Sequence, residues 1–447
     1  MTSITTNQVL ESIEEEEERV SQSSWRLITT AGMGFFTDAY DLFVIGIVTA
    51  LLLPVWHLST FQVSLLNGAA LISAALGAIV FGILSDKFGR KKMYGIEVGI
   101  LFVGALLSAL STSFTWLLVT RMLVGFGIGG DYPSSAVVVS ENANRKNRGF
   151  LVLLVFAMQA LGLIVGPLLA SLLLAINLPQ DWAWRLLLAF GAIPAASVFY
   201  LRRTITESAR FLLNKQAPLE VSRAVSELAG YDDEIGHGAF KEQKLTSKRW
   251  MKCLIGTAGA WFLLDVVFYG NGISSTLIMN QILPAADLLK HTLLSALIFL
   301  CFAAPGYYFA AKYVDQIGRK TLQILGFLII AICYCAIGLI PAVTQLISLF
   351  VIIFGLSFFF VNFGPNTTTF LIPSEIFPTK IRASAHGISA ATGKVGAFVG
   401  AFGLPLLLES KGLSFTLTLL GIISLLGIFL TFLVPEMKGI ALDSNIE

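Results

Sequence analysis

The chain has 447 residues, of which 55% are hydrophobic and only 13% are charged, and its mean hydropathy is +0.79. Soluble domains carry about 25% charged residues, so this composition argues against a soluble enzyme, a disordered protein and a nucleic-acid binder. The 30 basic and 28 acidic residues leave a net charge of +2, which points to no polyanionic partner.

The chain opens with a polar segment, residues 1–26, that contains an unbroken acidic row from Glu14 to Glu18. It lacks the pattern of a cleavable signal peptide, so we expect an acidic, solvated tail.

Twelve apolar runs follow, each near the 20 residues that a helix needs to cross the hydrocarbon layer. The first six are residues 27–53, 63–84, 93–110, 114–139, 149–175 and 184–201; the second six are 253–283, 288–311, 321–340, 342–372, 385–408 and 414–434. The polar segment 202–252 separates them. The pattern predicts an all-α membrane protein with six-helix bundles at 27–201 and 253–434, a central loop at 202–252 and a tail at 435–447.

Basic residues predict the orientation of these spans. The tails and the loops on their side hold 25 Lys and Arg, and the loops on the other side hold 3. Because cytoplasmic loops carry the excess of basic residues, we expect both termini and the central loop in the cytoplasm. The protein would then be integral to a plasma or inner membrane.

The two halves repeat one another. Asp86–Lys91 and Asp315–Lys320 share the pattern D-x-x-G-R-K, and Ser140-Glu141 recurs as Ser374-Glu375. Repeated six-helix halves are typical of carriers that expose a midplane site to each side in turn. The D-x-x-G-R-K loops resemble the cytoplasmic motif of the major facilitator superfamily. We therefore expect gating or structural ion pairs among Asp86, Arg90, Glu97, Arg121, Glu141, Asp315, Arg319 and Glu375.

Several ionisable residues fall inside the apolar runs, where insertion costs roughly 2.5–3.5 kcal/mol each. Such residues are expected to face the bundle interior and to serve function. They are Asp38, Asp41, Glu97, Arg121, Asp131, Asp265 and Lys394.

Asp38 and Asp41 are three residues apart, which places them on one helix face. Two carboxylates that lose water together do not both ionise readily, so this pair is a candidate for proton coupling; a headgroup-wetted pair at the helix end is the alternative. A buried Arg121 needs an acidic partner. Glu97 or Asp131 could serve, and a purely structural ion pair stays open.

A second polar set suits an oxyanion. Trp261, Asp265 and Tyr269 form one stripe at a spacing of four, and a polar run at 362–369 contains a Gly-Pro break. Such a break predicts an irregular helix that faces a cavity. Gln159 and Lys394 add donors. Asp265 would repel an anion unless the anion carries its own proton, as dihydrogen phosphate does and sulfate does not.

Five motifs carry a resemblance. They are G-G-D-Y-P at 129–133, F-A-M-Q at 156–159, W-F-L-L-D-V-V-F-Y-G at 261–270, N-F-G-P-N-T-T at 362–368 and H-G-I-S-A-A-T-G-K at 386–394. The chain resembles the phosphate:proton symporter family of the major facilitator superfamily, which includes plant and fungal phosphate transporters.

The resemblance implies phosphate contacts and proton-coupling residues. The phosphate contacts would be Tyr132, Gln159, Trp261, Asp265, Tyr269 and Asn366. Lys394 would act in binding or release, and Asp38, Asp41 and Asp131 would couple protons.

We therefore expect a monomeric carrier that imports phosphate with protons, without cofactor or metal. Another substrate (a glycerophosphodiester, an organic anion or a sugar) and a non-transporting nutrient receptor are the alternatives. We do not expect the protein to be an enzyme, because the spans contain no nucleophile–base pair or metal triad. The sequence further predicts that Asp38, Asp131, Asp265, Asn366 and Lys394 surround one shared hollow.

Overall fold

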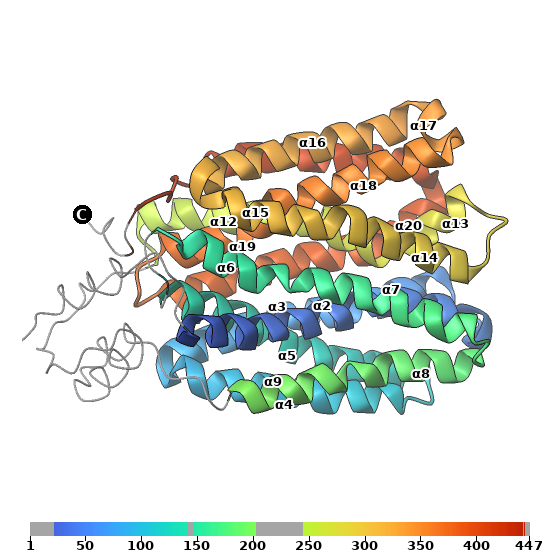
Figure 1. Cartoon of the computed structure of the whole chain (residues 1–447), viewed down its shortest axis with the longest axis horizontal. Coiled ribbons are helices and arrows are strands. Elements are labelled where there is room, and N and C mark those ends of the chain that lie inside the picture. The colour runs from blue at the N-terminus through green and yellow to red at the C-terminus, as the bar shows by residue number, and fades with distance from the viewer. Residues whose placement is uncertain (1–21, 142, 144–145, 203–244, 441, 443–447) are drawn as a thin grey trace, which may run out of the picture.

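The computed structural model describes residues 22–141, 143, 146–202, 245–440 and 442, and these residues form a bundle of long helices (Figure 1). The described part of the chain contains no strand. Most of the predicted N-terminal tail, residues 1–21, and most of the predicted central loop, residues 203–244, lie outside it.

The first half supplies six crossings of the bundle. Two of them are broken into consecutive helices, at Met158 and at Gly191. The helices are α2 (Gln22–Trp56), α3 (Thr60–Phe88), α4 (Arg90–Ala109), α5 (Phe114–Glu141), α6 with α7 (Arg148–Ala157, Gln159–Ala175) and α8 with α9 (Gln180–Phe190, Ala192–Arg202).

The second half supplies the other six crossings, with more interruptions. Its last two crossings form one 50-residue helix, α20, that turns at Gly412 with φ +77°. The helices are α12 with α13 (Lys248–Ile273, Ser275–Ile282), α14 with η1 and α15 (Leu288–Ile298, Phe299–Ala303, Ala304–Ile317), α16 (Arg319–Leu339), α17 (Pro341–Gln345), α18 with α19 (Ile347–Phe363, Pro365–Ile376) and α20 (Arg382–Thr431).

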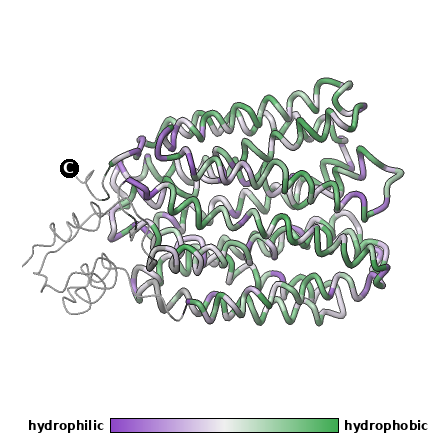
Figure 2. Tube along the Cα trace, viewed as in Figure 1, coloured by the Kyte–Doolittle hydropathy of each residue, from purple (hydrophilic) through white to green (hydrophobic). Residues whose placement is uncertain are grey.

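The surface of the bundle suits a membrane. Nine helices in the described residues are long and apolar enough to cross one, and α4, α5 and the second arm of α20 complete the predicted twelve. Large apolar side chains such as Leu172, Ile332 and Phe429 are more than half exposed, which fits contact with lipid. Figure 2 shows hydrophobic helix bodies, with hydrophilic residues concentrated at the two ends.

The sequence repeat is also a structural repeat. Gly89 and Gly318 adopt nearly the same conformation, with φ/ψ of 100°/150° and 105°/151°. Each N–H closes the preceding helix, on the carbonyl of Ser85 in one half and of Val314 in the other. A positive φ favours glycine, so the glycine of D-x-x-G-R-K makes the tight turn that both halves need.

Several boundaries differ from the sequence-based expectation. The last residues assigned to the N-terminal tail are helical, because α2 begins at Gln22 rather than at residue 27. The predicted span 342–372 begins only at Ile347, because residues 341–345 form the separate helix α17. Arg202, assigned to the central loop, is instead the buried last residue of α9, and α12 begins at Lys248 rather than Cys253. The break expected at Gly364-Pro365 is confirmed, because α18 ends at Phe363 and α19 begins at Pro365.

Candidate functional site

Buried polar side chains from both halves meet between the two bundles. Two of them follow helix breaks: Gln159 is the first residue of α7, and Asn366 follows the Gly364 break. The structure brings together all seven residues predicted to bind substrate, each at most 3% exposed. They are Tyr132, Gln159, Trp261, Asp265, Tyr269, Asn366 and Lys394.

One part of this network is built on an amide from each half. The Tyr307 hydroxyl, on α15, donates to Oε1 of Gln159 at 2.5 Å and accepts from Nδ2 of Asn366 at 2.7 Å. Nδ2 of Asn366 also lies 2.8 Å from Oδ1 of Asn362. Since Gln159 belongs to the first half and the other three residues to the second, these bonds join the halves.

The rest of the network ends on a charge. Gln159 Nε2 donates to the Tyr132 hydroxyl at 3.3 Å, which lies 3.0 Å from the Tyr269 hydroxyl. Lys394 Nζ donates to that hydroxyl at 2.8 Å and to Oδ2 of Asp265 at 3.4 Å. The ammonium group is also 4.2 Å from the ring centroids of Tyr132 and Tyr269. Hydrogen bonds therefore run unbroken from Asn362 to Asp265.

One carboxylate oxygen of Asp265 is an unused hydrogen-bond acceptor. Its Oδ2 faces Lys394, whereas its Oδ1 is buried and has no hydrogen-bond partner among the described residues. The site thus combines several N–H and O–H donors with one strong unused acceptor. A ligand that carries both lone pairs and an acidic O–H group would match this set.

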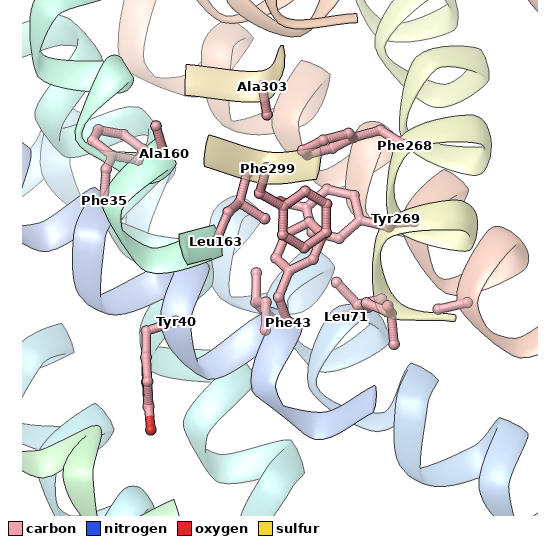
Figure 3. Close-up of a cluster of buried hydrophobic side chains, with 14 of the residues drawn as sticks. Phe35, Tyr40, Phe43, Leu71, Ala160, Leu163, Phe268, Tyr269, Phe299 and Ala303 are labelled. Carbon is pink, nitrogen blue, oxygen red and sulfur yellow. The ribbon is translucent and has the colours of Figure 1, made fainter. Parts of the chain in front are cut away.

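Aromatic rings enclose the polar network. Phe156 and Phe370, one from each half, stack at 4.4 Å, and Phe35 packs edge-on against both. Tyr269 stacks on Phe43 at 5.1 Å, within the buried cluster of Figure 3. Apolar surroundings strengthen the polar contacts that they enclose.

Trp261 lies in the aromatic wall and also contacts the Asp265 carboxylate of the polar network. Its ring centroid lies 6.1 Å from that of Tyr132 and 5.5 Å from that of His386. His386 Nε2 lies 3.0 Å from the Phe370 carbonyl oxygen.

An acidic cluster lies inside the first half. Arg202 contacts Glu97 Oε1 at 2.9 Å through Nη1 and Asp131 Oδ1 at 2.6 Å through Nη2. Asp38 lines a small cavity with Glu97 and Asp131, and its buried Oδ2 has no hydrogen-bond partner among the described residues. The lack of a side chain at Gly34 lets α2 approach the Arg202–Asp131 pair closely.

The prediction that one hollow is shared by all five residues is therefore wrong, because Asp38 and Asp131 lie in the acidic cluster and the other three lie in the network between the halves. Asp131 faces the acidic cluster, while its chain neighbour Tyr132 faces the network between the halves, because successive helical residues point about 100° apart. The two clusters are neighbours along α5, because Asp131 belongs to one and Tyr132 to the other.

Arg121 has a partner that the sequence did not indicate. Its Nη1 lies 3.4 Å from Asp41 Oδ1, and its Nη2 donates to the Asp41 carbonyl at 2.6 Å. The expected partners, Glu97 and Asp131, are occupied by Arg202 instead. Asp41 is thus held in an ion pair, and Asp38 is the member of the Asp38/Asp41 pair that lies in the acidic cluster.

A second buried ion cluster joins the halves at the end of the bundle where α6 and α16 begin. Glu375 accepts from Arg148 at 2.9 Å and from Arg319 at 2.7 Å. Asp315 contacts Arg319 at 2.8 Å and accepts the Phe150 backbone N–H at 2.7 Å. At the opposite end the Ser171 and Thr292 hydroxyls lie 2.9 Å apart, again across the halves.

Two functional candidates, Arg202 and Tyr307, were missed in the sequence. Arg202 stands at the edge of a basic, polar segment, so nothing marked it as buried. Tyr307 is 1% exposed and its neighbour Tyr308 is 61% exposed, and a Tyr-Tyr pair in an apolar run does not reveal which ring faces inward. The side chains of Asp86, Arg90 and Glu141, predicted to form gating pairs, lie outside the described part of the structure. The described residues hold no group of three His, Cys, Asp or Glu arranged for a metal ion.

Comparison with known proteins gives consistent matches over the whole chain. A family model described as "Sugar (and other) transporter" matches residues 4–445. The chain is 37% identical to "Probable inorganic phosphate transporter 1-7" of Arabidopsis thaliana, over 95% of this chain and 92% of the relative. It is 36% identical to "Inorganic phosphate transporter 1-6" of Oryza sativa subsp. japonica, over 95% and 93%.

Solved structures share the fold. A proton:xylose symporter of the MFS (major facilitator superfamily) superimposes with a TM-score of 0.77 at 20% identity, over 95% of this chain and 98% of that one. A partially occluded inward-open xylose transporter from E. coli gives a TM-score of 0.72 at 21% identity. The arrangement is therefore the major facilitator fold, with two six-helix halves.

Proposed function

This chain belongs to the sugar (and other) transporter family, and we propose that it carries inorganic phosphate across the membrane together with protons. It is an integral membrane transporter and not an enzyme. The relatives that match it over nine-tenths of their length are named inorganic phosphate transporters, which supports phosphate as the substrate.

The observation that carries the proposal is the Asp265–Lys394 pair beside a row of neutral donors. Lys394 supplies the positive charge, and Gln159, Asn366 and the tyrosine hydroxyls supply donors to phosphate oxygens. The free Oδ1 of Asp265 accepts a hydrogen bond from a P–OH group. Dihydrogen phosphate satisfies both parts of the site, whereas sulfate presents only acceptors to a carboxylate and is repelled.

Proton coupling is assigned to the acidic cluster next to this site. Glu97 and Asp131 both pair with Arg202, and Asp38 lines the same small cavity. A proton on Asp38 or Asp131 therefore reduces the excess negative charge that closure must bury. Because Asp131 is followed directly by Tyr132, the acidic cluster lies next to the binding site. Loss of the proton on the far side restores the negative charge and helps the anion to leave.

Alternating access is assigned to the two bundles, residues 27–201 and 253–434. They rock about the site, and the ion pair of Glu375 with Arg148, which crosses between the halves, breaks when that end opens. The distribution of basic residues supports a cytoplasmic location for this end and for both termini. A monomer in the cell membrane suffices, since every proposed ligand comes from one chain.

Flux in liposomes tests this function. Purified protein is reconstituted, and uptake of labelled phosphate is measured with and without an inward proton gradient. We expect the gradient to drive accumulation. Sulfate, a sugar, an organic anion and a glycerophosphodiester are added in turn as competitors. Strong competition by one of the last three would identify that class of compound, and not phosphate, as the substrate. Binding without flux would identify a receptor.

The Asp265→Asn variant tests the selectivity argument. The amide removes the negative charge that repels sulfate and also weakens the contact with the P–OH group. We expect the KM for phosphate to rise about tenfold, as for loss of a hydrogen bond to a charged group, and sulfate to become a competitor. Sulfate that already competes with phosphate in the wild-type protein would contradict the role of Asp265.

A further inference from the structure

Tyr307 occupies an unusual position in the site. Its hydroxyl is the shared partner of two amides, donating to Gln159 at 2.5 Å and accepting from Asn366 at 2.7 Å. Those amides belong to opposite halves of the protein. The phenol thus makes the same two contacts that phosphate would make. It accepts from Asn366, as a phosphate oxygen would, and it donates to Gln159, as a P–OH group would.

The closed arrangement in the structure gives the Gln159 and Asn366 amides hydrogen-bond partners without a substrate. Ion pairs join the halves at one end and Ser171 with Thr292 joins them at the other. Between these ends, the hydrogen bonds of Tyr307 and the Tyr132–Tyr269 contact cross from one half to the other. A buried amide left without a partner is costly, so a closed site that lacked the Tyr307 hydroxyl would be less stable.

We propose that Tyr307 serves the return of the empty carrier, by taking the place of the substrate on Gln159 and Asn366 when the halves close without phosphate. The proposal rests on the proposed phosphate transport. A symporter must pass through the closed state twice in each cycle, once loaded and once empty. Phosphate replaces the hydroxyl on the amides in the loaded passage, so Tyr307 matters for the empty passage.

Net uptake and exchange separate these two passages. Uptake into phosphate-free vesicles needs the empty carrier to return, whereas exchange of labelled for unlabelled phosphate uses only the loaded passage. The test compares both rates in the same vesicles for wild type and Tyr307→Phe. Tyr308→Phe is the matched control, because that ring is 61% exposed on the same helix.

We expect Tyr307→Phe to lower the ratio of net uptake to exchange about tenfold, with the KM of exchange within about twofold of wild type. The control should keep the wild-type ratio. Because the ratio is taken within one preparation, loss of some folded protein leaves it unchanged. Tyr307→Met, which also lacks the hydroxyl, should give the same shift and replaces the Phe variant if that one does not reconstitute.

Other outcomes overturn the proposal. A parallel fall of both rates with a raised KM would make Tyr307 a phosphate ligand, and unchanged rates would make it a packing residue. If wild-type protein exchanges no phosphate at all, the proposed substrate is wrong, and that failure is distinct from an unchanged ratio in the variant.

Discussion

Two buried ion clusters in the described residues differ in their charge balance and in the parts that they join. The first sets two guanidinium groups, Arg148 and Arg319, against two carboxylates, Asp315 and Glu375, and its Arg148–Glu375 pair crosses between the halves. The cluster around Arg202 lies within the first half and sets three carboxylates, Asp38, Glu97 and Asp131, against one guanidinium group in the described residues.

The difference in charge balance indicates what each cluster can do. In a balanced cluster each charge has an opposite charge to pair with, so it suits a latch that is either made or broken. A cluster with excess negative charge is costly to bury unless it gains a proton, so it suits the step that senses the proton gradient. We therefore assign the coupled proton to this cluster, where Oδ2 of Asp38 has no hydrogen-bond partner among the described residues.

The largest expected effect comes from Asp38→Asn. The amide cannot release or accept the coupled proton, so accumulation of phosphate against its gradient should fall more than tenfold. The rise of uptake with falling external pH should flatten, whereas phosphate exchange should persist. Proton-driven uptake into liposomes at several external pH values measures this.

Asp131→Asn should also block uphill uptake, because Asp131 shares Arg202 with Glu97. Asp181→Asn is the control, since that side chain is 54% exposed in a pair with Arg185 and exposed pairs contribute little. Uphill uptake at the wild-type level in either site variant would discard that residue as the coupling group.

An intermediate effect is expected from Glu375→Gln in the balanced cluster. The change leaves Arg148 and Arg319 without their shared buried carboxylate, and breaking such a pair costs about 3–5 kcal/mol. We expect a melting temperature lower by several degrees and uptake reduced about tenfold, with the pH dependence retained.

Thermal unfolding in detergent and proteoliposome flux measure these changes, with the exposed Glu409→Gln as the control. A variant that lost pH dependence while keeping its stability would reverse the roles assigned to the two clusters.

The smallest effect is expected from Asp315→Asn. Asp315 is 21% exposed, and the amide oxygen can still accept the Phe150 N–H, while Arg319 keeps Glu375. We expect uptake within about threefold of wild type, and a larger loss for Asp315→Ala, which removes the acceptor. Equal losses in the two variants would show that the charge, and not the backbone contact, holds this part of the latch.

Much of the architecture followed from the sequence, because local physics dictates it. Apolar runs of about 20 residues must become membrane helices, and the glycine of D-x-x-G-R-K must turn with positive φ in both halves. The burial of Gln159, Asp265 and Asn366 was also foreseeable, since such polar groups are too costly in lipid to face anything but the interior.

The pairing of charges was decided only by the tertiary structure. Arg121 binds Asp41 across 80 positions and Arg202 binds Glu97 across 105, and residue types alone do not rank one buried carboxylate above another. Helix rotation likewise decides that Tyr307 and not Tyr308 faces the interior. It also decides that Asp131 and Tyr132 face different clusters. Helix rotation is set by the packing of neighbouring helices, and it cannot be predicted from a hydrophobic run alone.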